Sequence, residues 1–83
     1  MAGTVRSAPY QRLLKALVEL RKSRGLSQSD LAERLGKPPS FVGKFELGER
    51  RLDVVEAFII LRALDAQPAA VLEDVLVELP DKL

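Results

Sequence analysis

The side chains most often used for enzyme catalysis and metal binding are missing from this sequence. It contains no His and no Cys, which removes the commonest general base, the usual nucleophilic thiol and the preferred ligands of zinc. No glycine-rich phosphate loop and no pair of carboxylates at a catalytic spacing takes their place. We therefore expect no enzyme, no metal site and no cofactor.

The chemistry that remains is that of cations and hydrogen-bond donors, and its distribution is uneven. Residues 1–51 hold eleven Lys and Arg against five Asp and Glu, whereas residues 52–83 hold two against seven. A chain this short can segregate charge by chance. A basic half joined to an acidic half nevertheless predicts one face for a polyanion and another face for a different contact.

These side chains must be positioned by helices, because the apolar residues recur at helical spacing almost throughout. Tyr10, Leu14 and Leu17 begin one such stripe. No strand pattern and no repeat appears, so the predicted fold class is all-α. We expect a flexible lead-in over 1–8 and a single domain over 9–83. The five expected helices span 9–24, 27–35, 39–47, 53–64 and 68–79.

Local signals set the ends of these helices. Ser27 and Asp53 have the spacing of capping boxes, each with an acidic residue three positions later. Gly36 ends the second helix, and Asp65 tolerates the left-handed conformation after the fourth. The helix over 53–64 is apolar nearly all round, and its core stripe is predicted from the spacing of a subset of its residues. That subset is Ala57, Phe58, Leu61 and Leu64.

The third helix presents polar side chains on the side away from its apolar residues. Val42 and Phe45 are expected to point inward, which leaves Ser40 and Lys44 one turn apart on the outer face. This is a geometry for reaching the edges of DNA bases. Lys44 is able to bind guanine or a phosphate, or to remain a solvated lysine, and the sequence does not separate these roles.

The segment LSQSDLAERLG at 26–36, followed by SFVGKFE at 40–46 and Gly48, resembles the Cro/C1-type helix-turn-helix regulators (the XRE family). The likeness covers roughly residues 10–72, and ERRLDVVE at 49–56 is similar to a common bacterial subgroup. The resemblance implies a five-helix, lambda-repressor-like domain that binds double-stranded DNA and regulates transcription. In such a pair the second helix enters the major groove.

The same resemblance assigns roles to polar residues around the helix pair. It implies that Gln28 holds a phosphate at the start of the second helix, where the helix N-terminus also attracts anions. It implies a structural ion pair between Arg21 and Glu46. Further phosphate contacts are expected from cations that flank the third helix, each of which alone would be an ordinary solvated charge. They are Lys37, Arg50 and Arg51.

At three positions of the third helix, the residue differs from the polar, base-contacting side chains that are common in this family. Pro39 has no donor, although it is able to touch a thymine methyl group, and Gly43 has no side chain. Phe41 lies between the core side and the DNA side, so core packing and contact with a sugar or thymine methyl remain open. These three residues are included in the expected DNA interface, where few base contacts would leave specificity to DNA shape.

The C-terminal third has more apolar surface than one small core uses. We expect a homodimer through the last two helices that binds an inverted-repeat operator as a repressor or autoregulator. Alternatives are a fifth helix that only covers the monomer, and an antitoxin-like module that binds a partner protein. No signal peptide or membrane span is evident, so a cytoplasmic location is expected. The residues assigned to the interface are Ile59, Ile60, Val71, Leu72, Val75, Leu76 and Leu79.

Overall fold

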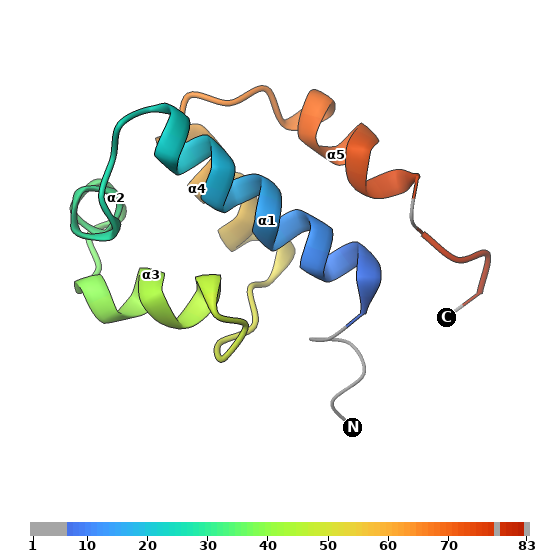
Figure 1. The fold of residues 1–83 in the computed structure, drawn as a ribbon, viewed down its shortest axis with the longest axis horizontal. Coiled ribbons are helices and arrows are strands. Elements are labelled where there is room, and N and C mark those ends of the chain that lie inside the picture. The colour runs from blue at the N-terminus through green and yellow to red at the C-terminus, as the bar shows by residue number, and fades with distance from the viewer. Residues whose placement is uncertain (1–6, 78, 83) are drawn as a thin grey trace.

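Five α-helices and no strand make up the part of the chain that the structure describes, which confirms the all-α fold class (Figure 1). The computed structural model describes residues 7–77 and 79–82, so most of the expected lead-in over 1–8 lies outside the described residues. No helix in the described ranges is long and apolar enough to cross a membrane. The helices are α1 (Ala8–Ser23), α2 (Gln28–Leu35), α3 (Pro39–Glu46), α4 (Val54–Ala63) and α5 (Pro68–Leu76).

The ends of the helices follow local chemistry. Ser27 and Asp53 each accept a hydrogen bond from the backbone N–H three residues later, and the acidic side chain at that position accepts one from the backbone N–H of the cap residue. Gly36 has a φ of 68°, which an L side chain rarely adopts. Asp65 has a φ of 55°, as expected for a residue that tolerates this conformation.

The helix α5 is shorter than expected. It ends at Leu76, three residues before the predicted end at 79. The backbone N–H of Leu79 instead donates to the carbonyl of Leu76, closing a turn. Leu79 precedes Pro80, and a residue before proline is disfavoured in the α conformation.

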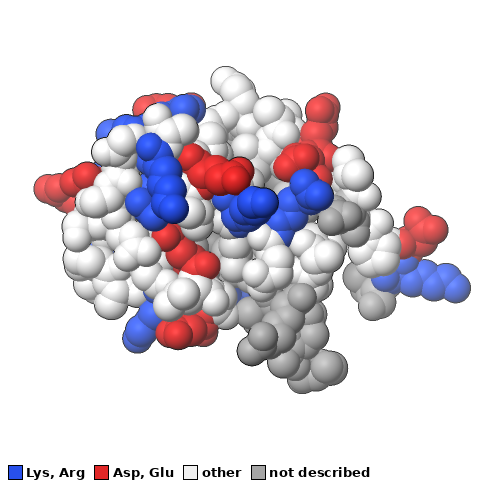
Figure 2. All heavy atoms as spheres, viewed as in Figure 1, with Lys and Arg blue, Asp and Glu red and all other residues white. Residues whose placement is uncertain are grey.

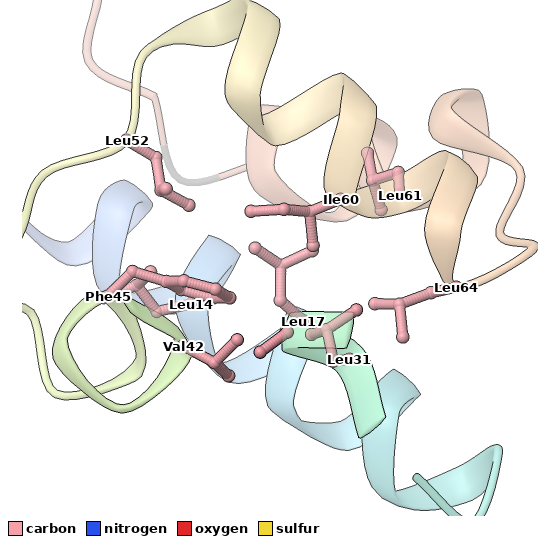
Figure 3. Packing of buried hydrophobic residues seen from close by; sticks show 10 residues of the cluster. Leu14, Leu17, Leu31, Val42, Phe45, Leu52, Ile60, Leu61 and Leu64 are labelled. Atoms are coloured by element: carbon pink, nitrogen blue, oxygen red, sulfur yellow. The ribbon is translucent and has the colours of Figure 1, made fainter. Parts of the chain in front are cut away.

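The core lies where α1, α2, α3 and α4 converge, as Figure 3 shows. Phe45 of α3 is fully buried, and Leu52 is contributed by the loop before α4. None of the residues of α5 is fully buried, because this helix lies along α1 at the edge of the core (Figure 1). The core residues are Leu14, Leu17, Leu31, Ala32, Val42, Phe45, Leu52, Ile60, Leu61 and Leu64.

The predicted core face of α4 was wrong at one position. Phe58 is 43% exposed, and Ile60 is buried in its place at 1% exposure. Apolar residues surround this helix, so periodicity does not identify the inward face. Packing selects the side that carries Ile60, Leu61 and Leu64. Ile60 was expected in a dimer interface, but its side chain is already buried within one chain. It is therefore a core residue and is not available for an interface.

Two arginines, one directly after α1 and one in α2, bind carbonyls at the C-terminal end of α4. Arg24 donates from Nε to the carbonyl of Leu64 at 2.8 Å and from Nη2 to that of Asp65 at 3.1 Å. Arg34 donates to the carbonyl of Ala63 at 2.8 Å. The last carbonyls of a helix lack intrahelical partners and carry partial negative charge, so these guanidinium groups stabilise α4 and tie it to α1 and α2.

Candidate nucleic-acid interface

The helices α2 and α3 form a pair joined by a short turn over residues 36–38. The backbone N–H of Lys37 donates to the carbonyl of Ala32 at 3.0 Å, which closes the end of α2. Pro38 stands before the first residue of α3 in an extended conformation. Ala32 is fully buried, and its small side chain allows close packing of α2. This pair is a helix-turn-helix motif.

The helix α3 has one buried face and one exposed face. Val42 and Phe45 are buried, as expected. Ser40 and Lys44 are exposed one turn apart, and Pro39 is exposed at the start of the helix. An ideal Cβ on Gly43 would lie 3.6 Å from Gln28 Oε1, an ordinary contact, so a side chain would fit there. Since Gly43 has no side chain, a groove wall would be able to approach the backbone of α3 closely at this position.

A buried ion pair connects α1 to α3 beside this face. Arg21 Nε lies 2.7 Å from Glu46 Oε2, and Nη2 lies 3.1 Å from Oε1, so the expected pair is present with bidentate geometry. Arg21 Nη1 also donates to the carbonyl of Leu26 at 2.8 Å. The two side chains are only 10% and 8% exposed. A pair this well bonded satisfies groups that water no longer reaches.

Gln28, the first residue of α2, is tied to this pair. Its side-chain nitrogen donates to Glu46 Oε1 at 2.9 Å, while the residue itself stays exposed. An amide nitrogen carries two hydrogens, so one donor remains for a phosphate. The pair thus positions the residue expected to hold a phosphate, a link between Gln28 and Glu46 that the sequence did not predict.

Phe41 is half-buried at the junction of α3 with the loop before α4. Its ring meets Phe45 edge-on, with 5.7 Å between the centroids. Two cations lie over the same ring, with Arg50 at 4.9 Å and Lys37 at 5.5 Å from the centroid. Of the two roles expected for Phe41, packing within the protein is therefore observed. Contact with a sugar or a thymine methyl group stays a prediction.

Arg50 is bonded to α4. Its Nη1 and Nη2 donate to the two carboxylate oxygens of Glu56, each at 2.9 Å. These bonds lower the pKa of the Glu56 carboxyl, and the hydrogen bond from the Asp53 backbone lowers it further. The same pair raises the pKa of Arg50. The expected phosphate contact from Arg50 competes with this ion pair.

Basic and acidic residues that are separated in the sequence lie next to one another in the structure. Figure 2 shows Lys and Arg beside Asp and Glu on the face it presents. Several arginines of the basic half are bonded within the protein, and Arg12 adds a 3.5 Å ion pair with Asp74. Lys37, Lys44 and Arg51 are exposed near α3, with Arg51 lying 5.7 Å over the ring of Tyr10.

The apolar surface expected to dimerise is only partly exposed. On α4, Ile59 is 53% exposed, beside a hollow of about 100 Å³ whose walls include Leu35 and Phe41. Leu76 and Leu79 are exposed at the end of α5 and just beyond it. The remaining α5 positions are half-buried, and they are Val71, Leu72 and Val75.

This fold and its exposed α3 face define a helix-turn-helix DNA-binding domain, and comparison with known proteins gives the family. A helix-turn-helix family model matches residues 17–71. A solved structure, an XRE-family like protein from Pseudomonas syringae pv. tomato str. DC3000, is 44% identical over 93% of this chain and 94% of that one, with a TM-score of 0.82. The chain belongs to the Cro/C1-type (XRE) family of DNA-binding regulators. A search of curated proteins gave no match.

Proposed function

We propose that the chain is a repressor, or an autoregulator of its own operon, that binds an inverted-repeat operator as a homodimer. The observation that carries this proposal is the exposed face of α3, where Ser40 and Lys44 stand clear of the core beside Gln28 at the start of α2. Such a face fits the major groove of duplex DNA. Because its target would be chromosomal DNA, we also propose that the protein is located in the cytoplasm.

The homodimer is supported by the outer surface of α4. Val55, Phe58 and Ile59 are exposed on the side opposite to the buried residues of this helix. A contiguous apolar patch of this kind is usually an interface. For the two copies of such a dimer to occupy successive major grooves, their α3 helices must lie about 34 Å apart, one turn of DNA.

Selection of bound duplexes from a random-sequence pool tests this function. We expect recovery of an inverted repeat with half-sites about 10 base pairs apart, bound by a species of twice the chain mass. Phosphate contacts from Lys37 and Arg51 of both copies, about four cations, would give log K a slope of about −4 against log salt. Failure of folded protein to retain any duplex at low salt would refute operator binding, and a co-purifying protein bound to α4 would favour the antitoxin-like alternative.

Lys44 is expected to read a base. It is exposed on the outer face of α3, and no hydrogen bond or ion pair involves its side chain within residues 7–77 and 79–82. Lys44→Ala should weaken operator binding by roughly 1–3 kcal/mol, and should relax the preference at one base pair per half-site. Quantitative binding to single-base operator variants measures this. A uniform loss across all variants, with the salt slope less steep by about 2 for the dimer, would instead assign Lys44 to a phosphate.

Lys15→Ala serves as the matched control for Lys44→Ala. Lys15 is an exposed lysine of α1, away from α3 in the sequence, and its loss removes the same charge. We expect the Lys15 variant to keep the affinity and the base preference of the wild type.

A further inference from the structure

The loop after α3 is fixed to the end of that helix through its backbone. Gly48 has a φ of 82°, and this turn brings the N–H of Glu49 to 2.9 Å and that of Arg50 to 3.2 Å from the carbonyl of Lys44. These bonds satisfy a carbonyl at the end of α3 that lacks an intrahelical partner. The backbone of Arg50 therefore moves with α3.

The side chain of Arg50 joins this loop to the start of α4. Both of its Nη atoms donate to Glu56, and Nη1 also donates to the carbonyl of Arg51 at 2.9 Å. Glu56 in turn accepts from the backbone N–H of Asp53, which caps α4. A planar guanidinium bound to both oxygens of a carboxylate has little freedom to turn.

The same guanidinium covers Phe41, which directly follows Ser40 and lies about one turn before Lys44 on α3. Its central carbon lies 4.9 Å from the ring centroid of Phe41, a ring that also packs edge-on against Phe45 and lies 5.5 Å from Lys37 Nζ. Arg50 thus contacts α3 at Phe41 and α4 at Glu56 with one rigid group. Any tilt of α3 against α4 would break the stacking or the ion pair.

We propose that Arg50 is a positioning residue that sets the orientation of α3 against α4 for DNA binding, and that it does not grip a phosphate. This inference rests on the proposed function, because the orientation of α3 matters through the operator. A phosphate near Arg50 would also meet the carboxylate of Glu56, whose charge cancels that of the guanidinium. Phosphate contact on this side of α3 is then left to Lys37 and Arg51.

Neutralising Glu56 separates the two roles of Arg50 by the sign of the effect. If Arg50 positions α3, Glu56→Gln should weaken operator binding about tenfold, the cost of a lost charged hydrogen-bond pair. If Arg50 grips a phosphate, Glu56→Gln should strengthen binding, since it releases the guanidinium and removes a negative charge near DNA. Binding is measured on the selected operator with variants shown by circular dichroism to be folded at the assay temperature.

Two Arg50 variants complete the test. Arg50→Ala should lose about as much affinity as Glu56→Gln, the double variant should lose no more than either, and the salt slope should stay that of the wild type. Arg50→Lys should fail to restore binding, because an ammonium keeps the charge but neither forms the bidentate pair nor stacks as a plane. Arg51→Ala, the neighbouring control, should make the slope less steep by about 2 for the dimer.

The ratio of operator binding to scrambled-duplex binding distinguishes positioning from a general loss of stability. Misorientation of α3 should lower this ratio in folded protein, whereas partial unfolding lowers both affinities together. Rescue by Arg50→Lys, or a less steep salt slope in Arg50→Ala, would overturn the positioning role while operator binding itself stands. A wild-type protein that retains no duplex would overturn the proposed function, and the positioning role with it.

Discussion

Replacing Glu46 with alanine should leave most of the protein molecules unfolded. The change strands the guanidinium of Arg21, a residue only 8% exposed, without its counter-charge. Breaking a buried pair in this way costs about 3–5 kcal/mol, which approaches the whole stability of a domain of this size. It also removes the acceptor that holds Gln28. Urea denaturation followed by circular dichroism measures the loss.

The matched control removes both charges together. The double variant Arg21→Met, Glu46→Leu should keep most of the wild-type stability, because well-packed apolar residues often replace a buried ion pair at little cost. A Glu46→Ala variant within about 1 kcal/mol of the wild type would contradict this account, since that is the value of an exposed pair.

Replacing Ile59 with aspartate should convert the protein to a monomer and weaken operator binding by about 10²- to 10⁴-fold. The side chain is 53% exposed in the single chain, so the fold should tolerate the change. A carboxylate buried at a two-fold axis would face its own copy, and losing the dimer removes the effective concentration that the first half-site gives the second. Light scattering gives the mass, and titration of the operator gives the affinity.

The conservative change Ile59→Val is the control for the aspartate variant, and it should remain dimeric. An Ile59→Asp protein that stays dimeric would place the interface elsewhere on the surface. A monomeric variant with undiminished affinity would show that each half-site is bound independently.

The elements of this fold could be predicted because their signals are local. The capping boxes at Ser27 and Asp53 and the left-handed Gly36 and Asp65 each depend on residues within one turn. Those signals gave the order of the helices and the bounds of four of them to within one residue.

The inward face of α4 and the roles of the arginines could not be predicted in this way. Periodicity fails for a helix that is apolar all round, as Phe58 and Ile60 demonstrate. Arg24 bonds to a carbonyl 40 residues away and Arg34 to one 29 residues away, distances over which sequence spacing carries no signal. Arg50 and Glu56 are six residues apart, a separation that indicates neither a helical pair nor a cap.

The binding of arginines within the protein also affects how the regulator finds its site. Arg21 and Arg50 are paired with carboxylates of their own chain, which cancel their charge, so these two arginines should contribute little to the attraction of non-specific DNA. Binding to random duplex comes almost entirely from phosphate contacts. If the proposed function is right, we expect short stays on non-operator DNA, and occupancy of the operator would then depend on the few groups that α3 presents.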